Sequence, residues 1–142
     1  MALLLKNAHV IDPQVGLNET ADILVRDGNI VEIGQNLTME KGVERDLGGK
    51  IVVPGLVDIH VHLREPGYEL KEDIASGTRA AAHGGFTAVC CMPNTKPVID
   101  NAVGVEYVKA RAAAVGKCRV HVAGSCSQGL KVDTLSEMGD MV

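Results

Sequence analysis

LVDIHVHL, residues 56–63, alternates apolar and polar side chains along its length. Successive side chains of a β-strand point to opposite faces, so Asp58, His60 and His62 share one face and the apolar residues share the other. Three ionisable groups on the inner face of a parallel sheet destabilise it unless a partner such as a cation is present. The pattern therefore predicts a strand facing a site, with His60 and His62 as ligands of one metal ion. The alternative is two histidines that are satisfied on a half-exposed strand.

Strands and helices alternate in the sequence after residue 55, as apolar periodicity and terminal glycines indicate. The expected elements are a strand at 56–63, a helix at 74–83, a strand at 86–92, a helix at 101–115, a strand at 119–123 and the start of a third helix at 132–138. Strand followed by helix, three times over, implies parallel strands joined by right-handed crossovers. We therefore expect an α/β fold.

Residues 1–53 follow a different pattern, in which short apolar runs are separated by turn signals. The Asp27-Gly28 step lies between two such runs and predicts a tight hairpin, because both central positions of that turn need a positive φ. We expect residues 1–53 to form a small β module and residues 54–142 to form the α/β domain, with the boundary at Val53/Pro54.

The composition excludes several classes of function. The 142 residues are 46% hydrophobic, which is enough to bury a core of ordinary domain size. A formal net charge of −4 and only three aromatic residues make nucleic acid an unexpected partner.

Lys6 interrupts the apolar run at residues 3–5, so we expect no secretion signal and no membrane span, and we place the protein in the cytoplasm. The four cysteines are expected to be reduced, buried and inert.

Two polar residues follow directly after predicted strands. Arg64 comes after the strand at 56–63, and Asn94 comes after the strand at 86–92. The carboxyl ends of parallel barrel strands carry the active-site loops, so both side chains are expected at the same rim. A guanidinium can hold a planar carboxylate in bidentate fashion while an amide donates to one of its oxygens. Taken singly, Arg64 would be an ordinary exposed arginine and Asn94 a turn residue.

Three segments carry a family resemblance, namely DIHVHLREPG at residues 58–67, residues 68–77, and MPNT at residues 92–95. Together they resemble the dihydroorotases of the amidohydrolase superfamily. The DxHxH element alone is shared with hydantoinases, allantoinases, ureases and many deaminases, whereas the REPG extension combined with MPNT is much narrower. Residues 1–53 also resemble the first strands of the small β-sandwich that these enzymes carry beside their barrel.

The resemblance implies a (β/α)8 TIM-type barrel and a zinc-dependent, reversible conversion of N-carbamoyl-L-aspartate to L-dihydroorotate in de novo pyrimidine biosynthesis. It implies that His60 and His62 bind zinc, in a centre of one or two ions. It also implies that Arg64 and Asn94 hold the substrate's carboxylate. Asp58, deeper in the strand, would support the ligands or the structure. A homo-oligomer or an association with aspartate carbamoyltransferase is a further expectation.

The barrel is expected to be incomplete in this chain. A whole barrel needs roughly 250 residues, and the residues after position 53 are enough for about three βα units. Two histidines are one ligand short of a catalytic zinc site, so the further metal ligands and the general acid/base are expected beyond Val142. We therefore expect the chain to be the amino-terminal portion of a longer enzyme and to be inactive alone.

Two other functions stay open. A hydantoinase- or allantoinase-like ring opener would use the same metal ligands, but a substrate without a carboxylate would leave Arg64 and Asn94 without a role. A catalytically inactive dihydroorotase-like scaffold or regulatory partner is the non-enzymatic alternative, and lost metal ligands would mark it. The remaining histidines, His9, His83 and His121, are expected to be structural, although an inward-facing His121 would approach the site.

Overall fold

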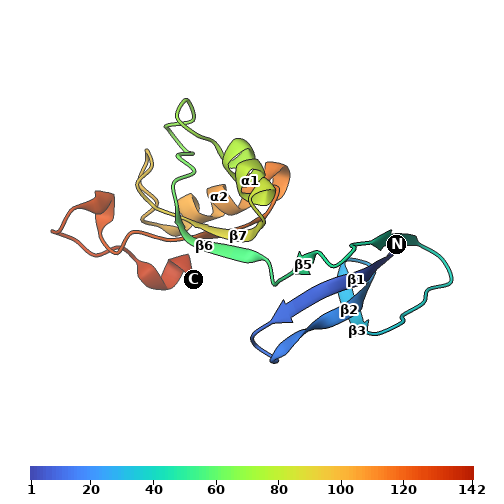
Figure 1. Ribbon diagram of the computed structural model, residues 1–142. Helices are drawn as coiled ribbons and strands as arrows, with labels where there is room; N and C mark the ends of the chain where they lie inside the picture. The colour runs from blue at the N-terminus through green and yellow to red at the C-terminus, as the bar shows by residue number, and fades with distance from the viewer. The chain divides into compact units, whose positions relative to one another are not determined.

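The computed structural model describes residues 1–142, which form two compact units, Met1–Pro54 and Gly55–Val142 (Figure 1). The first unit is built from strands alone, and the second alternates strands with helices. None of the helices is long and apolar enough to span a lipid bilayer.

The first unit is a five-stranded sheet. Its strands are β1 (Ala2–Asp12), β2 (Leu17–Arg26), β3 (Asn29–Gly34), β4 (Val43–Asp46) and β5 (Ile51–Val52). The spatial order is β3-β2-β1-β4, and β5 also pairs with β1. Because β1 pairs antiparallel with β2 and parallel with both β4 and β5, this long strand is the centre of the sheet.

The hairpin predicted at Asp27-Gly28 is confirmed. Arg26 faces Asn29 at the last pair of the antiparallel ladder between β2 and β3. The two residues between them have φ values of +49° and +80°. Both values lie in the left-handed region that a two-residue hairpin turn requires, which is why an Asp-Gly step occurs there.

A buried ion pair lies in the same sheet. The carboxylate of Asp22 accepts hydrogen bonds from Nζ of Lys6 at 2.7 Å and from the backbone N–H groups of Asn7 and Leu37 at 2.9 and 3.0 Å. These bonds, the one from Lys6 above all, lower the pKa of Asp22 in spite of the opposing effect of burial. The charged form of Asp22 therefore stabilises the folded sheet.

Asp22→Asn is expected to lower the free energy of unfolding by about 3 kcal/mol at neutral pH, because it leaves the ammonium of Lys6 without its counter-charge in a half-buried place. The folded-state pKa of Asp22 is lowered, so its contribution is present above the pKa of unfolded aspartate and is lost as the pH falls through the folded-state value. Urea unfolding measured at about pH 7 and about pH 3 should show a gap between wild type and variant that shrinks in acid.

Asp27→Asn is the matched control for this measurement. The Asp27 carboxylate also forms an ion pair, with the amino terminus, but both groups are more than four-fifths exposed, at 85% and 86%. Exposed pairs contribute little to stability, so this variant should unfold almost like the wild type. An equal loss of stability in both variants would contradict the role given to the buried pair.

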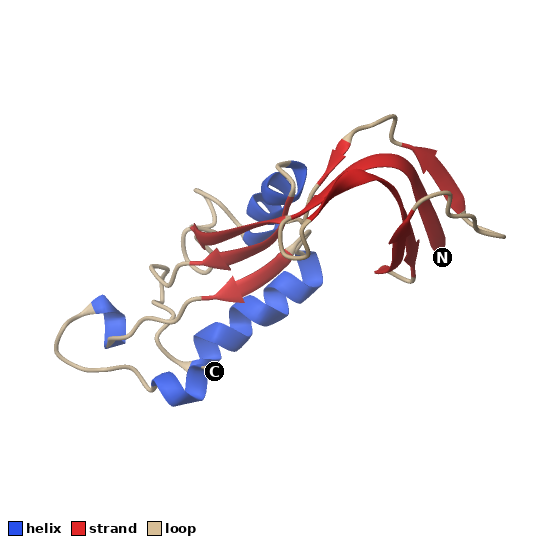
Figure 2. Cartoon of the chain, turned by 60° about the horizontal axis from the view of Figure 1, so that its bottom comes forward, coloured by secondary structure: helices blue, strands red, loops and turns tan.

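The second unit is a three-stranded parallel sheet covered by two α-helices (Figure 2). Its elements are β6 (Leu56–Val61), α1 (Ile74–His83), β7 (Phe86–Cys91), α2 (Ala102–Val115) and β8 (Arg119–Val122). The sheet order is β6-β7-β8, with both pairs parallel. Helix α1 packs against β7, helix α2 packs against β8, and the helices also touch each other. The predicted order of the three strands and the first two helices is confirmed, and so is the parallel pairing of the strands.

Side-chain caps explain where the two helices begin. The carboxylate of Asp73 accepts a hydrogen bond from the N–H of Ser76 at 2.7 Å, in a reciprocal capping box at the start of α1. Asn101 accepts in the same way from the N–H of Gly104 at 3.0 Å at the start of α2. At the other end of α1, the N–H of Gly84 donates back to carbonyls of the last turn. The two predicted helices are confirmed.

The core of this unit lies between the sheet and the helices. Its buried members are Leu63, Ile74, Val89, Cys91, Ile99, Val105 and Val108. Val61 packs against this cluster, whereas Val57 and Ile59 on the same strand are 60% and 78% exposed. The core therefore covers the apolar face of β6 only at its last residue, Val61, which lies between the two histidines.

The prediction of a third helix starting at residue 132 is wrong. A β-bridge joins Ser127 to Leu135. Residues 132–134 before the bridge and residues 136–137 after it have no regular secondary structure. The only regular element beyond is a 3-10 turn at Met138–Met141, which has no side-chain cap. β-Branched Val132 and Thr134 favour extended backbone over helix, and this local preference outweighs the apolar spacing.

The expectation of buried, inert cysteines holds for one of the four. All four are free thiols. Cys91 is buried, and burial raises the pKa of its thiol to about 11, which keeps it protonated. Cys90 and Cys118 are half-buried and Cys126 is exposed, so the expectation of burial is wrong for these three.

Candidate functional site

His60 and His62 lie side by side at the carboxyl end of β6. His60 belongs to the strand, and His62 follows directly after its last residue. Their ring centroids are 5.3 Å apart, and the planes of the rings are inclined by 72°. Both side chains are exposed. The two imidazoles therefore form an accessible pair of nitrogen donors.

Asp58 supports the backbone beside this pair. Its Oδ1 accepts a hydrogen bond from the N–H of His60 at 3.0 Å. The ladder between β6 and β7 is irregular here, because Asp58 pairs with Val89 while Val61 already pairs with Cys91. The extra residue of such a bulge lacks a ladder partner. The carboxylate of Asp58 supplies a partner to the N–H of His60.

Asn94 contacts His62 directly. It lies in the loop that follows β7, and its Oδ1 is 2.9 Å from Nδ1 of His62. In the tautomer that carries its proton on Nδ1, the imidazole donates to the amide oxygen. That arrangement leaves the Nε2 lone pair of His62 and the amide N–H groups of Asn94 available to other partners.

Arg64 has an unusual backbone conformation. Its φ is +62°, a value that residues with a Cβ rarely adopt. The N–H of Glu65 donates to the carbonyl of Leu63 at 2.7 Å, which closes a three-residue turn with Arg64 at its centre. The guanidinium takes part in none of the ion pairs of the chain. Arg64 is therefore a half-exposed cation without a carboxylate partner in this chain.

The loops that follow β6 and β7 are joined to each other. The N–H of Lys96 donates to the carbonyl of Pro66 at 3.0 Å. Gly67 approaches Lys96 so closely that a Cβ on the glycine would lie 2.0 Å from the carbonyl oxygen of Lys96. One loop carries Arg64 and the other carries Asn94, so this contact holds together the two loops that bear the predicted anion-binding side chains.

We call His60, His62, Arg64 and Asn94 the rim residues. No group of three or more His, Cys, Asp or Glu side chains in the chain is placed to hold a metal ion, so these residues do not form a complete metal site by themselves. The two imidazoles fit an ion, because their rings are adjacent and Asn94 occupies only one nitrogen of His62. With an unpaired guanidinium nearby in sequence and a free amide, the rim suits a small anionic ligand next to a cation.

Residues 49–140 match the family model described as Dihydro-orotase-like. The chain belongs to this dihydro-orotase-like family. Curated dihydroorotases of Trichlorobacter lovleyi and Geobacter sulfurreducens are 53% and 55% identical to it over 142 residues, or 99% of the chain. The chain spans 33% of the length of each of these relatives. The family resemblance read from the sequence is confirmed, and so is its placement at the amino-terminal portion.

Solved structures share the fold of this dihydro-orotase-like chain. An L-hydantoinase (dihydropyrimidinase) from Arthrobacter aurescens superposes with a TM-score of 0.78 at 31% identity, over 88% of this chain and 28% of the other. A crystal structure of a dihydroorotase superposes with a TM-score of 0.61 at 18% identity, over 90% of this chain and 32% of the other. The predicted fold class, the first part of an α/β barrel preceded by strands, is confirmed.

Sequence reasoning missed Glu65, whose carboxylate is buried although the residue lies in a loop. The side chain is only 4% exposed. It accepts hydrogen bonds from Nε of Arg111 at 2.7 Å, from the hydroxyl of Tyr107 at 3.3 Å and from the backbone N–H of Ile74 at 3.0 Å. Only the spacing of Tyr107 and Arg111, about one turn apart on α2, could have signalled a shared partner. That spacing is too common to have identified Glu65.

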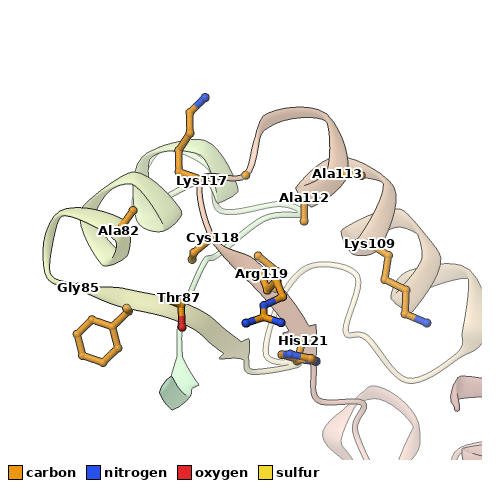
Figure 3. Close-up of a pocket in the computed structure, with 13 residues that line it drawn as sticks. Ala82, Gly85, Thr87, Lys109, Ala112, Ala113, Lys117, Cys118, Arg119 and His121 are labelled. Atoms are coloured by element: carbon orange, nitrogen blue, oxygen red, sulfur yellow. The ribbon is translucent and has the colours of Figure 1, made fainter. Parts of the chain in front are cut away.

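The dihydro-orotase-like chain also has a large cavity, whose lining residues are shown in Figure 3. It has a volume of about 850 Å³ and is lined by the start of β7, by α2 and by residues 117–121. Its charged lining is basic, with Lys109, Lys117 and Arg119. None of the rim residues lines it. His121 does line it, on β8.

Proposed function

We propose that the enzyme to which this chain belongs interconverts N-carbamoyl-L-aspartate and L-dihydroorotate in pyrimidine biosynthesis, with zinc as its metal. The observation that carries the proposal is a cation without a carboxylate partner, Arg64, two residues after the paired imidazoles and in a loop that is joined to the loop of Asn94. Dihydroorotate is a cyclic amide with a carboxylate on its ring. Its turnover needs both an electrophilic centre for the amide and an anchor for the anion.

His60 and His62 are the residues of this chain that would hold the zinc. Neutral imidazole nitrogens are common zinc ligands. When bound, zinc supplies Lewis acidity toward the amide carbonyl and toward water. Asn94 selects the tautomer of His62 through Nδ1, and Asp58 fixes the backbone of His60. The chain thus orients both donors through neighbours that do not bind the metal.

Arg64 and Asn94 would bind the carboxylate of the substrate. The guanidinium offers a planar fork of N–H donors that matches a carboxylate. The amide N–H groups of Asn94 are free to donate because its oxygen is already used by His62. Anchoring the ring by its carboxylate places the amide bond at the imidazole pair, and this positioning lowers the entropic part of the barrier.

A hydantoinase-like activity on a cyclic ureide without a carboxylate is the second candidate. The 31% identity to an L-hydantoinase favours it. The two imidazoles would serve such a substrate equally well. It would, however, leave the unpaired guanidinium of Arg64 without a partner, which is why the carboxylate-bearing ring is the substrate proposed first.

Arg64→Lys tests this proposal in the complete enzyme. The variant is expected to weaken binding of dihydroorotate by about 1.5–3 kcal/mol, seen as a roughly 10- to 150-fold rise in KM, because an ammonium cannot reproduce the planar fork. Steady-state kinetics with dihydroorotate and with dihydrouracil, which lacks the carboxylate, measure the effect. The KM for dihydroorotate should rise, and the KM for dihydrouracil should stay unchanged.

Arg79→Lys, at an exposed position of α1, is the matched control and should leave both KM values unchanged. An unaltered KM for dihydroorotate in Arg64→Lys would remove the carboxylate clamp from the proposal. A wild-type enzyme that prefers dihydrouracil over dihydroorotate would favour the hydantoinase-like activity instead.

A further inference from the structure

We propose that Glu65 and Arg111 are positioning residues, whose buried ion pair sets Arg64 for the carboxylate of the substrate. The inference rests on the function proposed above. Arg64 contacts the anion, and the ion pair behind it fixes where the guanidinium lies. The site therefore extends beyond the rim into the packing between the loop and helix α2.

The carboxylate of Glu65 is held from two helices at once. Its Oε1 accepts from Nε of Arg111 at 2.7 Å and from the hydroxyl of Tyr107 at 3.3 Å, both on α2. Its Oε2 accepts from the N–H of Ile74 at 3.0 Å, at the first residue of α1. A buried carboxylate is costly unless donors surround it, so the folded state places Glu65 where these three donors meet.

Arg64 lies between two buried anchors. Leu63 is 4% exposed and belongs to the hydrophobic core, and Glu65 is 5% exposed at the helix ends. Both neighbours are therefore fixed by the interior. The residue between them is directed out of the interior and remains half-exposed. Fixing residues 63 and 65 is thus a direct way to fix where the side chain of residue 64 begins.

The backbone at Arg64 is strained and needs such support. A residue with a Cβ adopts the φ of +62° found here only at an energetic cost, and the three-residue turn around it is uncommon. Strained turns persist only where their surroundings over-determine them, and they cluster at functional sites. Without the ion pair that fixes Glu65, the backbone of Arg64 would relax toward negative φ, and its guanidinium would change direction.

The donors on α2 suit this task chemically. Burial, followed by the charge of Glu65, raises the pKa of Tyr107, so its hydroxyl keeps the proton that it donates. The hydrogen bond to Glu65, followed by its charge, raises the pKa of Arg111. The side chain of Arg111 is 42% exposed, so it can be replaced without burying a new group.

Arg111→Gln in the complete enzyme tests the proposal through its selectivity. We expect KM for dihydroorotate to rise about ten- to a hundredfold, because a small displacement of a positioning group has effects of that size. The kcat/KM for carboxylate-free dihydrouracil and the zinc content should stay at wild-type values. Arg111→Lys keeps a cation within reach of Glu65 and should restore most of the loss. Lys109→Gln, which removes an exposed ion pair with Glu106 on the same helix, is the matched control.

Hydrogen exchange provides a second measurement that does not depend on activity. The N–H of Tyr68 donates to the carbonyl of Arg64 at 3.0 Å, and the N–H of Glu65 closes the turn. Both amides should exchange at least about tenfold faster in Arg111→Gln, because the turn opens more often. Lys109→Gln should leave them unchanged.

Equal losses for the two substrates in Arg111→Gln, or no loss at all, overturn the positioning role. So does unaltered exchange at the turn. If the wild-type enzyme acts on carboxylate-free rings alone, the proposed function fails while the exchange measurement still decides whether the ion pair holds the Arg64 turn. The two failures are therefore distinguishable.

Discussion

In the complete enzyme, His62→Ala is expected to lower turnover of dihydroorotate by about a thousandfold or more, because it removes a ligand of a metal whose Lewis acidity contributes several kcal/mol. The variant should also retain less zinc after dialysis, as measured by mass spectrometry of the metal. Loss of the imidazole frees the oxygen of Asn94, so the KM of any residual activity should rise as well.

His60→Ala should give the same loss of turnover and zinc, since the rings are adjacent. His83→Ala is the control, because this exposed histidine lies in the last turn of α1. It should keep wild-type turnover and zinc content. Full zinc occupancy in His62→Ala would show that other residues hold the metal and would contradict the assignment of this ligand.

The order of the elements could be predicted because it depends on local physics. The Asp27-Gly28 step specifies its turn through the φ values that it tolerates, and Asp73 and Asn101 specify helix starts through hydrogen bonds to nearby N–H groups. Residues 132–138 show the limit of this reasoning. There the apolar spacing suggested a helix, while β-branched residues and the bridge to Ser127 produce an irregular path.

The candidate site could be predicted in part, for a similar reason. Alternation along one strand brings His60 close to His62, and the ends of parallel strands bring Asn94 to the same rim. The bulge after Asp58 and the strained turn at Arg64 were not predictable, because each depends on contacts between distant segments. The ion pair between Glu65 and Arg111 was not predictable either, since nothing in the sequence links Glu65 to α2.

Gly67→Ala is expected to lower the stability of the second unit by about 3 kcal/mol or more, because two costs add at this position. The φ of Gly67 is +92°, which strains any residue with a Cβ. The new Cβ would also lie 2.0 Å from the carbonyl oxygen of Lys96, a backbone atom that cannot move cheaply. This clash is relieved only if the loops that follow β6 and β7 move apart. KM for dihydroorotate should therefore rise together with the loss of stability.

Gly85→Ala separates these two costs. Gly85 has a similar φ of +85°, but a Cβ there would meet no atom within 4 Å. Its substitution should therefore cost only the strain of the backbone, about 1–2 kcal/mol in urea unfolding, and should leave KM unchanged. The difference between the two variants measures the close approach of Gly67 to Lys96. If the variants lose equal stability and neither changes KM, the contact between the loops does not hold Arg64 and Asn94 together.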